Sequence, residues 1–130
     1  MKKKLLIITA ILELPAGLCL LFAPTFSVSM LFGAQQDLQL VKVLACTAGA
    51  AIISLAIICW LARNNRNSGT VIAGILFYNI AVAGILLHSA VIIKMSGALL
   101  WPAAGLHFIL AGWCIYCLQA NTAKVLRTNF

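Results

Sequence analysis

Residues 5–23 read LLIITAILELPAGLCLLFA, an apolar run that is interrupted by one carboxylate, Glu13, and one proline, Pro15. A helix needs about 20 predominantly apolar residues to cross the roughly 30 Å hydrocarbon core of a bilayer. This run meets that length, and three more runs of the same kind follow it. The sequence therefore predicts four transmembrane helices, at residues 5–23, 38–62, 70–93 and 98–119.

The composition also indicates a membrane protein. Of the 130 residues, 64% are hydrophobic and 8% are charged, whereas globular domains carry about 25% charged residues. A chain with so few polar residues would expose large apolar patches if it folded in water. We therefore expect one all-α domain over residues 1–130, an integral membrane four-helix bundle.

The segments between the runs indicate how the helices connect. Residues 24–37, PTFSVSMLFGAQQD, begin with a proline and carry several large apolar side chains, which predicts a short interfacial helix at residues 25–33. Residues 63–69, RNNRNSG, are polar and turn-forming, as expected for a cytoplasmic loop. Residues 94–97, KMSG, allow only a tight turn, so the last two helices should pack as antiparallel neighbours.

The basic residues cluster between the apolar runs, so the net charge of +7 indicates membrane topology and not a nucleic-acid partner. By the positive-inside rule, the side richer in Lys and Arg faces the cytoplasm. Seven basic residues share the side of the termini and two lie on the other side: Lys2, Lys3, Lys4, Arg63, Arg66, Lys124 and Arg127 against Lys42 and Lys94. We expect both termini in the cytoplasm, in a multi-pass protein of the bacterial inner membrane.

The first residues, MKKKLLIITAIL, have the basic and apolar regions of a secretory signal. No small-x-small cleavage motif ends the run, and the residue before Cys19 is the bulky Leu18. We therefore expect this segment to be retained as the first transmembrane helix.

Three strongly polar side chains fall near the middle of the predicted bundle. With a rise of about 1.5 Å per residue, Glu13 lies about 12 Å and Asn79 about 13 Å from the cytoplasmic edge. His107 lies about 13 Å from the outer edge. Because a carboxyl group facing lipid costs on the order of 2.5–3.5 kcal/mol, Glu13 should point inward, with His107 and Asn79 as its partners. Tyr78 can bring a hydroxyl to this layer, although neighbouring helix residues point about 100° apart.

Two interpretations of this layer stay open. It is either a structural contact that holds the helices in register or a site for a proton or ligand, because ionisable residues inside membranes are functional candidates. Lys42, the obvious cation for Glu13, is predicted about 10 Å or more from the Glu13 level. Pro15 removes a backbone donor and should bend the first helix.

A pair of cysteines suggests a different chemistry. Cys114 and Cys117, in GWCIYC, stand three residues apart and face the same side of a helix. This C-x-x-C pair on a fourth helix resembles the vitamin K epoxide reductase family, and the resemblance implies that the pair works on a quinone. Alternatively, cysteine is simply a small apolar residue suited to membrane helices. The spacing of His and Cys predicts no metal site, and we expect no cofactor.

Longer stretches resemble a group of small bacterial four-helix membrane proteins that are DoxX-like in layout. They are LELPAGLCLLFAPTFSVSMLFG at 12–33, CWLAR at 59–63, LFYNIAVA at 76–83 and LLWPAAGLHFILAGW at 99–113. The resemblance covers most of the chain. It implies the four-helix architecture and assigns no activity.

The position of Glu13, in AILE, is similar to that of the single helix-one carboxylate in the small multidrug resistance transporters. This resemblance implies that Glu13 alternately binds protons and cationic drugs in a dimer. Trp60, Tyr78 or Trp101 would then be aromatic contacts for a cation.

Our leading functional hypothesis is an accessory or interaction subunit, or a binder of a hydrophobic small molecule, with Glu13, Asn79 and His107 as the polar centre. A proton-coupled transporter that acts as a dimer through Glu13 is the first alternative. A thiol and quinone oxidoreductase that uses Cys114 and Cys117 is the second. The expected partners are the lipid bilayer, a second copy of the chain or a larger membrane complex, and a hydrophobic small molecule. Whether the protein is an enzyme stays open, and a non-enzymatic role is favoured.

Overall fold

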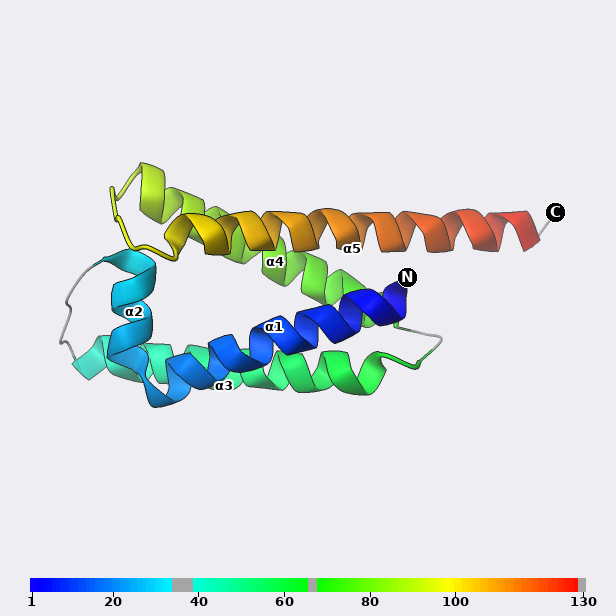
Figure 1. Ribbon diagram of the computed structural model, residues 1–130. Helices are drawn as coiled ribbons and strands as arrows, with labels where there is room; N and C mark the ends of the chain where they lie inside the picture. The colour runs from blue at the N-terminus through cyan, green and yellow to red at the C-terminus, as the bar shows by residue number, and fades with distance from the viewer. Residues whose placement is uncertain (34–38, 66–67, 129–130) are drawn as a thin grey trace.

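The structure, a computed structural model, describes residues 1–33, 39–65 and 68–128, with side chains as far as Ala120. In these residues the secondary structure is entirely helical, and the helices are α1 (Lys2–Phe22), α2 (Pro24–Phe32), α3 (Gln39–Ala62), α4 (Gly69–Val91) and α5 (Leu100–Thr128) (Figure 1). Four of them, all except α2, are long and apolar enough to cross a membrane. The all-helical class and the four long apolar helices are therefore confirmed for the described residues.

The helix boundaries differ from the predicted ones at several ends. α1 begins at Lys2 and not at residue 5, and α5 continues to Thr128 instead of ending at 119. The helix ends were predicted from the length of each apolar run. Helical hydrogen bonds also form between polar residues, however, and Lys and Arg are good helix formers. α4 ends at Val91 and not at 93, because Lys94 adopts a positive φ of 62° and the chain reverses there. Leu38, Asp37 and Arg66, which also entered the predictions, lie outside the described residues.

The four long helices form two antiparallel pairs. α1 packs along α3, and α4 packs along α5, whereas contacts between the pairs are few (Figure 1). The packing of α4 against α5 confirms the expectation drawn from the short KMSG connection. The start of α1 and the end of α5 lie at the same end of the molecule, and α2 lies at the opposite end (Figure 1).

Two glycines explain the close contact of α1 with α3. A Cβ atom added to Gly49 would lie 2.7 Å from the Gly17 carbonyl oxygen and 2.8 Å from the Leu21 amide nitrogen. A Cβ atom added to Gly17 would lie 2.9 Å from the Gly49 carbonyl oxygen. The two backbones therefore touch without intervening side chains, as small residues allow in membrane helix pairs. The sequence analysis did not identify the contact between Gly17 and Gly49.

The short helix α2 bridges the two pairs. It begins at Pro24, a residue favoured in the first turn because its missing N–H needs no partner there, and ends at Gly33, whose φ is 71°. In Figure 1 it stands across the long helices and contacts α1, α3 and α5. Its last turn meets the α4–α5 connection, where the Leu99 N–H donates to the Met30 carbonyl at 2.9 Å. A helix was expected at residues 25–33, but its role as a spacer was not.

The buried side chains show where the pairs meet. A core cluster formed by α1, α3, α4 and α5 contains Leu5, Leu6, Ala10, Cys59, Ile72, Ile75, Leu110, Cys114 and Cys117, toward the end opposite α2. Near α2, a separate cluster joins Leu86 of α4 to Leu100 and Ala104 of α5, with Phe32 of α2 packed against it. The pairs therefore meet in this core cluster at one end and are held apart at the other.

The glycine contact predicts a position-specific loss of stability. Gly49→Ala should lower the free energy of unfolding by about 1–3 kcal/mol, because the added methyl group overlaps the backbone of α1. Gly84→Ala, in α4, is the matched control, since a Cβ atom there meets nothing within 4 Å. Denaturant titration of the purified protein in mixed micelles measures both. Equal stability of the two variants would contradict the close backbone contact.

Candidate functional site

A cavity of about 680 Å³ lies between the two helix pairs, and all five helices contribute to its wall. Almost every lining side chain is apolar, including Leu20 of α1, Phe32 of α2 and Ala48 of α3. The exceptions among the lining residues are Glu13, Tyr78 and His107, so three of the predicted site residues meet at one cavity.

Glu13 faces inward because it lies on the buried stripe of α1. Leu6, Ala10, Glu13 and Gly17 are all buried and follow each other at helical spacings of three and four residues. Only 4% of Glu13 is exposed, and its Oε2 accepts a hydrogen bond of 3.1 Å from the Tyr78 hydroxyl. This bond connects α1 of one helix pair with α4 of the other.

His107 and Asn79 form a second contact, within the α4–α5 pair. The His107 Nδ1 atom lies 2.8 Å from Asn79 Oδ1, and the Asn79 amide group donates to the Ile75 carbonyl at 2.8 Å. Asn79 is fully buried. The His107 ring also stands edge-on to the Tyr78 ring, with 5.6 Å between the ring centroids. Side chains of three helices therefore form two hydrogen-bonded pairs joined by a ring contact, which together we call the polar chain.

The hydrogen-bond partners in the structure differ from the predicted ones. The hydrogen-bond partner of Glu13 is Tyr78, whereas His107 and Asn79 bond to each other. The reason is the rotation of about 100° between neighbouring helix residues: Tyr78 points toward α1, and Asn79 points toward α5. Lys42, the cation considered for Glu13 by sign, lies in the first turn of α3.

The cysteine pair lies apart from the cavity. Cys114 and Cys117 are buried in the core cluster at the opposite end from α2, together with Cys59. All five cysteines are free thiols. Among the described residues, no group of three or more His, Cys, Asp or Glu side chains is arranged to hold a metal ion.

Two features of this region were not found by sequence reasoning. One is the apolar cavity itself, which arises from the separation of helices that are far apart in the sequence. The other is Thr9, one turn before Glu13, which is fully buried and whose hydroxyl has no hydrogen-bond partner among the described residues. The 3–4 spacing from Thr9 to Glu13 was the signal that both face the same way.

Comparison with known proteins assigns no relatives. No family model matches the chain, and no significant match is found among curated proteins or solved structures.

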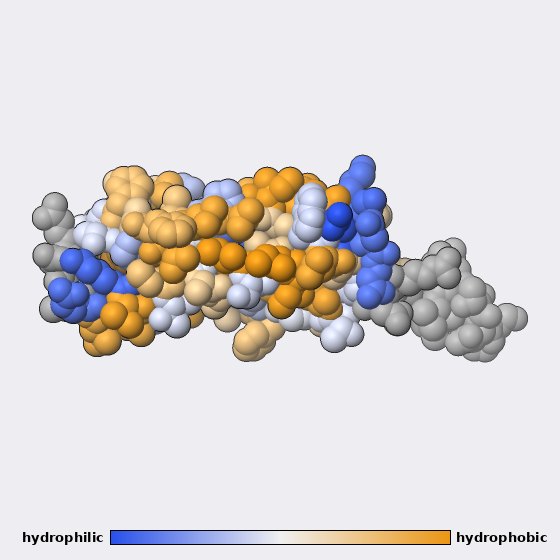
Figure 2. All heavy atoms as spheres, turned by 90° about the horizontal axis from the view of Figure 1, so that it is seen from below, coloured by the Kyte–Doolittle hydropathy of each residue, from blue (hydrophilic) through white to orange (hydrophobic). Residues whose placement is uncertain are grey.

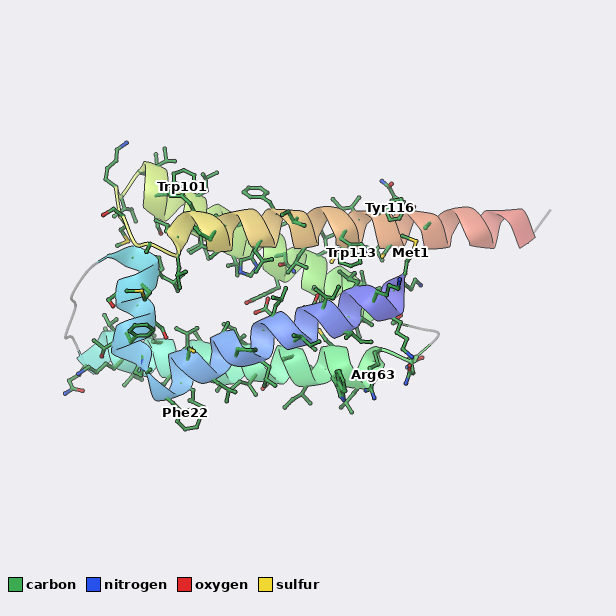
Figure 3. The ribbon with its side chains drawn as sticks, viewed as in Figure 1. Met1, Phe22, Arg63, Trp101, Trp113 and Tyr116 are labelled. Atoms are coloured by element: carbon green, nitrogen blue, oxygen red, sulfur yellow. The ribbon has the colours of Figure 1, made fainter. Side chains whose placement is uncertain are left out.

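The polar chain predicts an order of mutational effects on stability. Asn79→Leu should cost about 1–3 kcal/mol of unfolding free energy, because it leaves the His107 ring nitrogen unpaired in a buried setting. Tyr78→Phe should cost at least as much, because it leaves the buried Glu13 carboxyl group without its hydrogen bond. Tyr116→Phe is the control, because Tyr116 is 55% exposed and points away from the bundle (Figure 3).

Unfolding by denaturant in mixed micelles, with helicity followed by circular dichroism, measures the three variants. An effect of Tyr116→Phe as large as that of Tyr78→Phe would show that the bond to Glu13 contributes nothing specific.

Proposed function

We propose that this protein is a multi-pass membrane protein that binds a hydrophobic small molecule in the cavity between its helix pairs. The observation that carries the proposal is the cavity of about 680 Å³, walled by apolar side chains with polar groups at one place. Sites for small molecules typically measure about 300–1,000 Å³ and combine apolar walls with a few polar groups.

The surface supports residence in a membrane. Large apolar side chains, such as Phe22, Phe77 and Ile109, are mostly exposed on the outside of the long helices. Figure 2 shows apolar residues along the middle of one face and hydrophilic residues at its two ends. Trp101 lies at the α2 end, whereas Arg63 lies at the opposite end (Figure 3) and stacks 4.1 Å from the Trp60 ring centroid. Tryptophan and basic residues at both ends are typical of membrane interfaces.

The inner membrane of a bacterium, with both termini in the cytoplasm, is the location that fits this arrangement. Lys2, Lys3 and Arg63 gather at the end that holds the start of α1, whereas Lys42 and Lys94 lie toward the α2 end. α2, which stands across the long helices, would then lie along the outer interface.

The cavity is placed to receive its ligand from the bilayer. Leu44 of α3 and Ile85 of α4 line the cavity, yet 59% and 62% of their surfaces are exposed. From these exposed fractions we infer that the cavity opens between α3 and α4, which make few contacts with each other. In a membrane this opening faces lipid, so a lipid-soluble molecule can enter without crossing water.

The alternatives rest on fewer observations. A proton-coupled transporter that works as a dimer through Glu13 would use the same cavity, and ligand binding is the part of that hypothesis which the geometry supports. A thiol and quinone oxidoreductase would need Cys114 and Cys117 to reach a substrate, whereas both thiols lie in the packed core.

The topology predicts which connections react with a membrane-impermeant maleimide in intact cells. Lys94→Cys, in the α4–α5 connection, should react from outside, whereas Asn64→Cys should react only after the inner membrane is opened. The parent protein gives the background, because its five cysteines lie within helices. Labelling of Asn64→Cys but not of Lys94→Cys in intact cells would reverse the orientation.

Filling the cavity should abolish ligand binding. Ala48→Phe places a ring in the cavity, and Ala50→Phe, two residues later on the exposed side of α3, is the matched control. The probe is a long-chain alcohol that carries a photoreactive diazirine, added to the protein in lipid nanodiscs. We expect cross-links to peptides that line the cavity in the parent and in Ala50→Phe, and at least a fivefold loss in Ala48→Phe. Equal labelling of the two variants would reject binding in this cavity.

A further inference from the structure

We propose that the cavity selects lipophilic molecules whose head group donates hydrogen bonds, such as a hydroxyl or an amine, over equally apolar molecules whose head group only accepts them. This inference rests on the proposed function, because it names the ligand class of the same cavity. It follows from the direction of each hydrogen bond in the polar chain.

The contacts of Asn79 determine which atoms donate and which accept in the hydrogen bonds of the polar chain. The Ile75 carbonyl oxygen can only accept a hydrogen bond, so the Asn79 atom that lies 2.8 Å from it must be the amide nitrogen. The amide oxygen of Asn79 therefore faces His107. Because that oxygen can only accept, the His107 Nδ1 atom must carry a proton and donate it.

The other nitrogen of His107 is consequently an acceptor. A neutral imidazole with a proton on Nδ1 presents an unprotonated Nε2. His107 lines the cavity, and its Nε2 has no hydrogen-bond partner among the described residues. A ligand in the cavity meets a lone pair at this position and not an N–H group.

Tyr78 and Glu13 also offer hydrogen-bond acceptors to the cavity. The Tyr78 hydroxyl uses its only proton on Glu13 Oε2, so it offers the cavity lone pairs alone. In its ionised form Glu13 accepts through both oxygens, and in the described structure only Oε2 has a hydrogen bond. The remaining lining side chains are apolar. With Glu13 ionised, the wall therefore offers several acceptors and no donor.

The position of these acceptors sets the orientation of the ligand. Along α4, Tyr78 is the lining residue farthest from α2, and along α5 His107 holds the same position. On α1, Glu13 and its neighbour Leu12 are the farthest. The head group therefore lies at the inner end of the cavity, and the apolar tail extends toward α2 and the opening between α3 and α4.

The probes that test this selectivity carry the same dodecyl chain and differ in their head groups. Dodecan-1-ol and dodecylamine carry donors, whereas dodecyl methyl ether keeps the oxygen acceptor and lacks the proton. Each competes with the diazirine alcohol for cross-linking of the full-length protein in nanodiscs, at matched concentrations within the lipid. Since an ether leaves the buried acceptors unpaired, the two donors should compete about tenfold better than the ether.

One variant, Glu13→Gln, adds a hydrogen-bond donor to the cavity wall. Glu13→Gln keeps the size of the side chain, and its carbonyl oxygen can still accept from Tyr78, while its amide adds an N–H donor. In this variant the ether should compete within about twofold of the alcohol. The comparison of probes on the parent protein stands by itself if the variant does not fold.

The outcomes separate the two levels of the proposal. Competition by the ether equal to that by the alcohol would overturn the donor inference, because a donor such as a protonated Glu13 would then face the cavity, and would leave cavity binding intact. Failure of every probe to compete, with Ala48→Phe cross-linked like the parent, would overturn both. Stronger competition by the amine than by the alcohol would identify a cationic head group, and stronger competition by the alcohol would identify a neutral one. Both head groups donate hydrogen bonds, so both results support the proposal.

Discussion

The separation of the two helix pairs by α2 is the constraint on which the rest of the structure depends. α2 is tied to α1 at a sharp corner, where Ala23 ends one helix and Pro24 begins the next. Its other end is fastened to the α4–α5 connection, where a Cβ atom on Gly97 would lie only 2.1 Å from the Leu31 carbonyl oxygen. A rigid helix held at both ends keeps the pairs apart on this side, while the core cluster around Ile72 and Leu110 closes the other side. The cavity is the space that this geometry leaves.

The polar chain follows from the same geometry. In a hydrocarbon surrounding, a buried polar group is stabilised only if it finds a partner. Asn79 and His107 satisfy each other within the tight α4–α5 pair. Glu13 lies on the other pair and is reached only by the long side chain of Tyr78, which bridges the space between the pairs. The hydrogen bond between Tyr78 and Glu13 is therefore located where the cavity begins, so the same contact that joins the pairs also faces the cavity.

Much of the architecture could be predicted because it depends on local chemistry. The apolar runs were long enough to define four helices, the KMSG turn was too short for anything but an antiparallel pair, and burial of Glu13 followed from the high cost of a carboxyl group in lipid. The specific partner of Glu13 could not be predicted. Depth along the membrane placed Tyr78, Asn79 and His107 together, but the choice among them depends on the rotation of α4 about its own axis. That rotation is set by packing against α5, which a single sequence does not reveal.

The sequence by itself determined the number of long helices, the inward direction of Glu13 and the presence of a few polar groups near the middle of the long helices, because hydrophobic length and the cost of an unpaired carboxyl group are properties of each segment alone. Only the tertiary structure decided that Gly17 meets Gly49, that α2 separates the pairs, and that an apolar cavity ends at Glu13, Tyr78 and His107. These features depend on which helices touch and at what rotation, and such contacts join residues that are distant in the chain. The physical reason is that helix propensity and hydrophobicity act within a segment, whereas close backbone contact and hydrogen-bond direction exist only between segments.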